Sequence, residues 1–297
     1  MAKKGPAKQT KKLRVLAIDD EPGFLQSVTT MGRQHGFRID GVGSLEEAKE
    51  LIASKGRRHY HGVILDIMCL VTKDQSVESP AFLKHALDYL DKVAPELPRA
   101  IVTGSTGHYA NTSEYFADEK LYLKTNVGES LFEYLRKGAG ELWYYQLETK
   151  YPDVIATMTT CGFPEDLRAE VLDALRYMNH FDDSKISDNL ARLRRIQEGL
   201  YGELSKQRDD IVPTRFLKEE NGNISMRPLI NHLKDEKTHE GFIKDFAFAV
   251  YGATSDHGSH RRYSPVEYPP SSYTVQTLTY AMLDLILWAG GLVEKSG

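Results

Sequence analysis

The amino-acid sequence predicts two parts of different fold class: an α/β domain with a doubly wound, five-stranded parallel sheet, followed by an all-helical domain. In the first half, short apolar runs alternate with helical patterns, which is typical of a parallel sheet covered by helices. Beyond about residue 145 the strand signals disappear and only helical periodicity remains. A chain of 297 residues has room for about two such domains.

Five short segments are expected to be parallel strands, and four of them contain an apolar run that suits a buried strand. They lie at residues 13–19, 37–42, 61–67, 99–104 and 120–124. One helix between them is expected to start at a capping box formed by Ser44 and Glu47. The last helix of this half is expected to start at Glu129, to run past the edge of the domain and to end at Pro152.

Helical patterns occupy the second half at residues 164–180, 184–209, 226–236, 239–252 and 272–290. The second pattern is the clearest, because its apolar residues recur every three or four positions. These are Ile186, Leu190, Leu193, Ile196, Leu200 and Leu204. Residues 275–293 approach the length of a membrane span, but they include Asp284 and several threonines, so a buried amphipathic helix is expected and no membrane association.

Composition indicates a soluble, cytoplasmic protein. The net charge of −4 and the pI near 6.2 do not indicate the overall basic charge that is typical of nucleic-acid-binding proteins. Cys69 and Cys161 form neither a disulfide framework nor a metal-ligand spacing. Residues 1–12 are rich in lysine without an apolar core segment, so they are expected to be a disordered basic tail rather than a signal peptide; a nucleic-acid-binding arm is the weaker alternative.

Four of the predicted strand segments have polar residues directly after their apolar runs, which end at Ile18, Leu65, Val102 and Leu123. The polar residues are Asp19, Asp20 and Glu21, then Asp66, then Thr103, and finally Lys124. Because the carboxyl ends of parallel strands share one edge of a sheet, these side chains are expected to converge. Clustered carboxylates repel one another unless a cation neutralises them, and an all-oxygen cluster suits Mg²⁺. An aspartate on a metal, with a lysine and a hydroxyl nearby, is suited to accept a phosphoryl group.

In this order the four segments resemble the receiver domain of two-component response regulators, over residues 13–140. The resemblance implies a flavodoxin-like fold in which Asp66 is the phosphoacceptor. It also implies that Asp19, Asp20, Asp66 and the backbone carbonyl of Met68 hold Mg²⁺. A cognate histidine kinase or phosphotransfer protein is the implied partner. The alternative is an α/β domain whose acids at the strand ends merely cap helices.

By the same resemblance, Thr103 would hydrogen-bond one phosphoryl oxygen and Lys124 would pair with another. Glu21 has two interpretations, since it could reach the metal through water or simply favour the first turn of a helix.

Thr125 stands after Lys124 where receivers usually have proline, and Leu121 occupies the usual place of the aromatic switch residue. The neighbouring Tyr122 should point to the opposite face of the strand. Residues 68–80 are also longer and more polar than the usual loop.

Two constellations in the helical half could carry chemistry: Arg227 with His232, and Asp256 with His257. The second pair lies within residues 251–262, and this segment together with residues 193–198 gives residues 165–295 a weak resemblance to HEPN-like and abortive-infection helical domains. Many HEPN domains are metal-independent ribonucleases with an arginine and a histidine at this spacing. The resemblance therefore implies a possible effector site and RNA as a possible ligand.

A structural interpretation of these residues is favoured over catalysis. Pro228 marks a helix start directly after the arginine, and two residues five positions apart on one helix lie about 140° apart. Asp256 and His257 can cap the preceding helix in a turn in which Gly258 supplies a positive φ.

The predicted function is a response regulator that is phosphorylated on Asp66 and controls a helical interaction domain, without being an enzyme itself. The expected organisation is the receiver, a linker or helix extension at residues 141–163, and the helical output domain at residues 164–297. A homodimer is expected, and specific DNA binding is not. The alternatives are a receiver-regulated HEPN-like ribonuclease of a defence system and a phosphate sink or adaptor.

Overall fold

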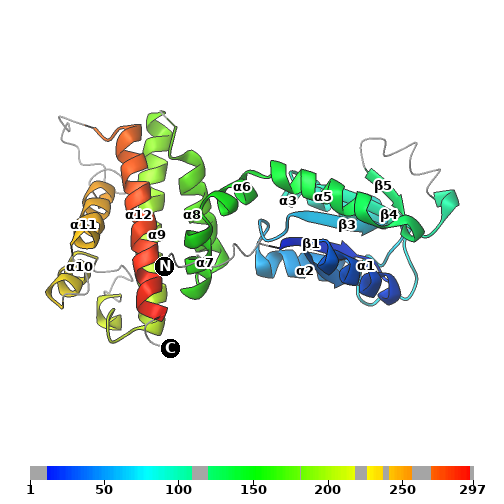
Figure 1. Cartoon of the computed structure of the whole chain (residues 1–297), viewed down its shortest axis with the longest axis horizontal. Coiled ribbons are helices and arrows are strands. Elements are labelled where there is room, and N and C mark those ends of the chain that lie inside the picture. The colour runs from blue at the N-terminus through cyan, green and yellow to red at the C-terminus, as the bar shows by residue number, and fades with distance from the viewer. Residues whose placement is uncertain are drawn as a thin grey trace, which may run out of the picture. The chain divides into compact units, whose positions relative to one another are not determined.

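The structure is a computed structural model that describes residues 12–108, 120–180, 182–217, 226–236, 241–255 and 269–294 (Figure 1). The chain divides into two compact units, Met1–Gln146 and Leu147–Gly297. The first unit contains a sheet with helices, and the second is entirely helical in its described residues. This is the combination of fold classes that the sequence predicts.

The first unit is built on a five-stranded sheet in which every pair of neighbouring strands is parallel, in the order β2-β1-β3-β4-β5. The strands are β1 (Leu13–Ile18), β2 (Phe37–Val42), β3 (Gly62–Asp66), β4 (Arg99–Thr103) and β5 (Lys120–Leu123). The prediction of a doubly wound, five-stranded parallel sheet is therefore confirmed. The strand order reverses between β1 and β3, and in open α/β sheets ligands bind at the carboxyl edge beside such a point.

The described helices of this unit are α1 (Pro22–Gln34), α2 (Leu45–Lys55), α3 (Phe82–Val93) and α5 (Glu129–Glu141). Phe37 of β2 packs against Phe132 of α5, with ring centroids 5.2 Å apart. It also lies beside Gly32 of α1, where an added Cβ would come within 2.6 Å of Ile39 Cδ1. Helices α1 and α5 therefore pack on the same face of the sheet, and α1 approaches β2 closely because residue 32 has no side chain.

The expectation of one long helix from Glu129 to Pro152 is wrong. Helix α5 ends at Glu141 because Leu142 has an extended backbone, with φ −69° and ψ 118°. A separate helix, α6 (Trp143–Lys150), follows. Pro152 then begins helix α7 (Pro152–Thr160) instead of ending a helix. A proline suits a helix start, because its φ is already helical and its missing N–H would have no partner there.

The second unit contains α7, α8 (Glu165–Tyr177), α9 (Asp183–Gln207), α10 (Met226–Asp235), α11 (Phe242–Thr254) and α12 (Ser272–Glu294). The predicted apolar stripe of α9 is buried along its length, from Ile186 to Leu204. Helix α8 packs closely on α9 at Gly199, where an added Cβ would lie 2.7 Å from Leu167 Cδ1. The core of this unit is therefore formed around α9.

Helix α12 is long and apolar enough to cross a membrane by length and composition, with a mean hydropathy of 1.2 in its most apolar window. However, 56% of that window is buried inside the protein. Its inward residues pack against other helices of the unit, and Gly290, for example, lies against Thr157 of α7. The expectation of a mostly buried amphipathic helix agrees with this packing.

Candidate functional site

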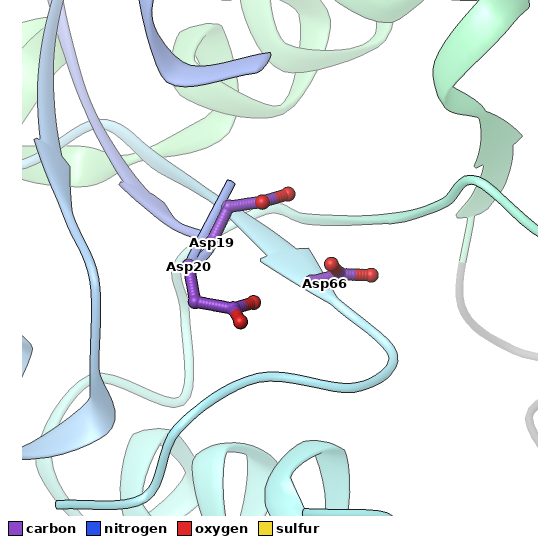
Figure 2. Close-up of side chains that lie close together, drawn as sticks. All are labelled: Asp19, Asp20 and Asp66. Carbon is purple, nitrogen blue, oxygen red and sulfur yellow. The ribbon is translucent and has the colours of Figure 1, made fainter. Parts of the chain in front are cut away.

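Three aspartates meet at the carboxyl edge of the sheet, where β1 and β3 end (Figure 2). Ile18 pairs with Leu65, so the residues that follow them, Asp19 and Asp66, are brought side by side. With Asp20, they offer one carboxylate oxygen each within 4.8 Å of one another. Asp19 and Asp66 are buried, with exposed fractions of 0% and 7%. The convergence that the sequence predicts is present.

Lys124 lies among these carboxylates at the end of β5, in a short 3₁₀ helix (Lys124–Asn126). Its Nζ is 2.8 Å from Asp66 Oδ2, 2.8 Å from Asp19 Oδ2 and 3.2 Å from Glu21 Oε2. It also lies 4.9 Å from the ring centroid of Phe24. One ammonium group thus links the acids that follow β1 to the acid that ends β3.

The positive charge of Lys124 does not balance the acids around it. Burial raises the pKa of Asp19 to about 6, and it raises the pKa of Asp66 too, although hydrogen bonds from Lys124 lower both values. Burial acts to lower the pKa of Lys124, but its hydrogen bonds to both aspartates outweigh this effect and raise it. A site with several carboxylates and one cationic side chain retains negative charge, which a divalent cation would neutralise.

The hydrogen bonds of Asp19 leave one of its carboxylate oxygens available to bind a metal ion. Asp19 Oδ1 accepts from Glu21 N at 2.9 Å and from Lys124 Nζ at 3.0 Å. Asp19 Oδ2 lies 2.8 Å from the same Nζ, but it is buried and accepts no hydrogen bond of suitable geometry within the described residues. Such an oxygen beside two other carboxylates fits a hard cation such as Mg²⁺.

The backbone after β3 orients Asp66. Its Oδ1 accepts from Ile67 N at 2.7 Å, while Oδ2 accepts from Lys124 at 2.8 Å. Burial raises the pKa of Asp66, and hydrogen bonds from the Ile67 and Met68 amides counteract that rise. Both carboxylate oxygens are therefore held in place. The role of the Met68 carbonyl as a metal ligand stays a prediction.

Thr103 is a buried residue at the end of β4, on the same edge of the sheet as the acids. It pairs with Leu123, the residue that precedes Lys124. Its Oγ1 accepts a hydrogen bond from Ser105 N at 3.2 Å, which leaves its own proton available for donation. The structure thus brings Thr103 to the edge where the sequence predicts it, and its contact with a phosphoryl group stays a prediction.

The aromatic residue next to the expected switch position points inward. Tyr122 is buried, and its hydroxyl donates to Ser130 O of α5 at 3.3 Å. Burial also raises the pKa of this phenol to about 12. Leu121, on the opposite face of β5, is only half-buried. Tyr122 is therefore fixed against α5.

The segment between β3 and α3, residues 67–81, is called here the β3–α3 loop. It contacts the first turn of α2, where Leu45 N donates to Leu70 O at 3.0 Å and Glu46 N donates to Val71 O at 3.1 Å. Ser79 N donates back to Cys69 O at 3.0 Å, which closes the loop. Sequence reasoning identified the unusual length of this loop but missed its contact with α2, because backbone acceptors leave no sequence signal.

Of the possible effector residues of the helical half, the structure describes Arg227 and His232. Arg227 is exposed in the first turn of α10. His232 is half-buried and packs against Phe216, with ring centroids 5.0 Å apart. The two lie about 140° apart around the helix. Asp256 and His257 fall outside the described residues.

No protein-family model matches the sequence, and no curated protein matches it significantly. Several solved structures are similar to the N-terminal part of the chain. A response regulator receiver domain protein from Clostridium thermocellum is 17% identical, with a TM-score of 0.35, and the match covers 43% of this chain and 94% of that one. A response regulator receiver protein from Sinorhizobium medicae is 18% identical, with a TM-score of 0.34, and the match covers 44% and 97%.

A third similar structure is response regulator protein TrrA from Thermotoga maritima, in complex with Mg²⁺-BeF. It is 23% identical, with a TM-score of 0.33, and the match covers 42% of this chain and 98% of that one. The N-terminal part of the chain, about 45% of its length, resembles receiver domains structurally, whereas the helical unit is not identified by these comparisons.

Proposed function

We propose that this protein is a response regulator of a phosphorelay, phosphorylated on Asp66 by a histidine kinase or phosphotransfer protein. The observation that carries the proposal is the link from Lys124 Nζ to Asp66 and Asp19 at the switch point of the sheet. A buried aspartate, a cationic partner and further acids at one edge supply the groups that transfer of a phosphoryl group to a carboxylate requires. Residues 13–140 form the receiver in this proposal.

In the transfer step, an oxygen of Asp66 forms a bond to phosphorus while the bond between phosphorus and the donor nitrogen breaks. Lys124 Nζ, already 2.8 Å from Asp66 Oδ2, places a positive charge where the negatively charged phosphoryl oxygens would arrive. Thr103 supplies a hydroxyl donor from the end of β4. Asp19, Asp20, Asp66 and the Met68 carbonyl would hold Mg²⁺, which supplies charge neutralisation for the transferring group.

Phosphorylation would change the contacts of Lys124. A phosphoryl group adds negative charge and strong hydrogen-bond acceptors, which compete with Asp19 for the ammonium group. The change would begin at Asp66, the residue from which the β3–α3 loop departs. Because Leu70 and Val71 of this loop accept from the first turn of α2, we expect α2 to respond. This differs from a route through an aromatic residue on β5, because Tyr122 is held against α5.

For the helical unit we propose an interaction role in a soluble, cytoplasmic regulator. The positions of Arg227 and His232 on different sides of α10 do not support a shared ribonuclease pocket. The net charge of −4 does not support a specific DNA-binding surface. The linker at residues 141–163 and the output domain at residues 164–297 remain part of this proposal.

Phosphorylation can be tested by incubating the full chain with acetyl phosphate and Mg²⁺ and measuring the intact mass. We expect an increase equal to one phosphoryl group, which Asp66→Asn and an excess of chelator both abolish. Asp88→Asn serves as the matched control, because Asp88 is an exposed aspartate on α3. Equal phosphorylation of Asp66→Asn and the wild type would refute the assignment.

A further inference from the structure

Helix α12 exposes a continuous stripe of side chains. Its exposed positions are Tyr273, Thr277, Tyr280, Asp284, Leu287 and Glu294. Tyr273 is 71% exposed, Tyr280 45% and Leu287 38%, which places them among the most exposed large apolar side chains of the described structure. The other residues of the helix are buried or half-buried. Large, largely apolar side chains therefore occupy three of the six exposed positions on the outer face of this helix.

The spacing of these positions is that of a coiled-coil seam. From Tyr273 to Leu287 they alternate by four and three residues, and Tyr273, Tyr280 and Leu287 recur every seven. A narrow stripe with this repeat is the surface that one helix presents to a second helix lying along it. The half-buried Gly291 continues the repeat. We call Tyr273, Thr277, Tyr280, Asp284, Leu287 and Gly291 the α12 seam; it is about 27 Å long at 1.5 Å per residue.

The sizes of the side chains are complementary when the seam faces an antiparallel copy of itself. With the two-fold axis midway between residues 280 and 284, Tyr273 meets Gly291 of the copy and Leu287 meets Thr277. Each large side chain then faces a smaller one. An added Cβ at Gly291 would have no atom within 4 Å, so the space that a tyrosine ring needs is open. By contrast, Gly290 is closed, since its Cβ would lie 2.5 Å from Thr157.

The charges select the same arrangement. A parallel pair would place Asp284 opposite Asp284 of the copy, which is unfavourable because like charges would meet. In the antiparallel pair, Asp284 faces Tyr280 of the copy instead. Lys150, Tyr280 and Asp284 of one chain line the same pocket of about 270 Å³ at the edge of the seam. In the antiparallel pair each Lys150 would therefore lie near Asp284 of the other copy as well as its own, and this pairing between copies occurs twice.

We propose that the helical unit associates with a second copy of this chain through the α12 seam, antiparallel about a two-fold axis. The seam and its edge pocket form a self-complementary patch, as a two-fold interface requires. Tyr273, Tyr280 and Leu287 supply the large side chains that the interface buries. The pair of Lys150 and Asp284 favours the antiparallel orientation of the two helices. Association through the α12 seam does not require phosphorylation of Asp66, so dimerisation and phosphorylation can be tested separately.

The first test measures the dimer dissociation constant of the full chain by sedimentation velocity over a concentration series. We expect the wild type to dimerise, and we expect Leu287→Lys and Gly291→Phe each to weaken the dimer at least tenfold. Gly202→Phe on α9 is the matched control, because a Cβ there would also meet no atom within 4 Å. The control should leave the dimer unchanged, and circular dichroism should show that every variant is folded.

The second test uses complementation between variants. Lys150→Glu and Asp284→Lys should each be monomeric alone, because each creates two like-charge pairs in its own dimer. An equal mixture should dimerise, because a heterodimer contains two opposite-charge pairs. Contacts within one chain cannot produce this recovery. A wild-type monomer, as would result if the receiver-like unit occupied the seam, would overturn the proposal. A dimer insensitive to the seam variants, or a mixture that stays monomeric, would do the same.

Discussion

The ammonium group of Lys124 lies 2.8 Å from the buried carboxylate of Asp19, although 105 residues separate them in the chain. This contact crosses the sheet from the end of β5 to the end of β1, and Asp66 at the end of β3 shares the same Nζ. The three strand ends are therefore held together by one charge. Because the acids outnumber the cation, stability, metal affinity and phosphorylation should all depend on the same few groups.

The first prediction concerns pH and Asp19. Burial raises its pKa from 3.8 to about 6, so Asp19 binds a proton more tightly in the folded protein than in the unfolded chain. The stabilising contribution of Asp19 is complete below pH 3.8 and is lost as the pH rises through about 6. Asp19→Asn should therefore be more stable than the wild type at pH 8 without Mg²⁺, by about 1–3 kcal/mol. The advantage should disappear towards pH 4, as urea titrations at several pH values can establish. A difference that is constant with pH would contradict this account.

The second prediction is that Mg²⁺ stabilises the receiver-like unit through its acids. A cation that binds only the folded protein adds about 2.7 kcal/mol at one hundred times its dissociation constant. The melting temperature of the wild type should rise with Mg²⁺ concentration, and Asp20→Asn should reduce the response. Asp74→Asn, which changes an exposed aspartate of the β3–α3 loop, is the control and should respond like the wild type. An undiminished response in Asp20→Asn would remove Asp20 from the metal site.

The third prediction separates phosphorylation from its conformational consequence. Lys124→Ala removes the cation between Asp19 and Asp66 and should cost about 3 kcal/mol of unfolding free energy without Mg²⁺. The variant should still accept some phosphoryl group on Asp66. However, hydrogen exchange at α2 should no longer change on phosphorylation, as it does in the wild type. Lys84→Ala, on the exposed side of α3, is the control. A normal response of α2 in Lys124→Ala would show that the lysine does not transmit the change.

The fourth prediction tests the packing of the helical unit. An added Cβ at Gly199 would lie 2.7 Å from Leu167 Cδ1, whereas one at Gly202 on the same helix would meet no atom within 4 Å. Gly199→Ala should therefore destabilise the protein by about 1–3 kcal/mol through overpacking. Gly202→Ala should stabilise it by up to about 1 kcal/mol, because alanine favours the helix. Stabilisation by both substitutions in chemical denaturation would show that α8 does not approach α9 so closely.

The fold of the first unit and the convergence of its acids were predictable because both depend on a repeated local pattern. Each buried strand is a short apolar run, and the residue after it must lie at the carboxyl edge of the sheet. Asp19, Asp66 and Lys124 could therefore be placed together without knowledge of any contact. The end of α5 was not predictable in this way, because its apolar periodicity continues past Glu141. Only the extended backbone of Leu142 interrupts the helix.

The α12 seam shows a second limit of sequence reasoning. Val275 and Leu278, which are buried, and Tyr273 and Tyr280, which are exposed, belong to one apolar run. The sequence indicates a largely buried helix, but hydropathy alone does not show which apolar residues face solvent. That distinction depends on where α7, α9 and α11 pack, which is a property of the tertiary structure.

The β3–α3 loop has a consequence for attaching reporters to this protein. Its two arms are anchored, one through Leu70 and Val71 on α2 and the other through Ser79 on Cys69, while Val77 between them is 75% exposed. A fluorophore at residue 77 would be attached to a loop that begins after Asp66 and is fixed by hydrogen bonds on both sides of the label. Its emission could follow occupancy of the acidic site in real time, without a label on any of the groups that form it.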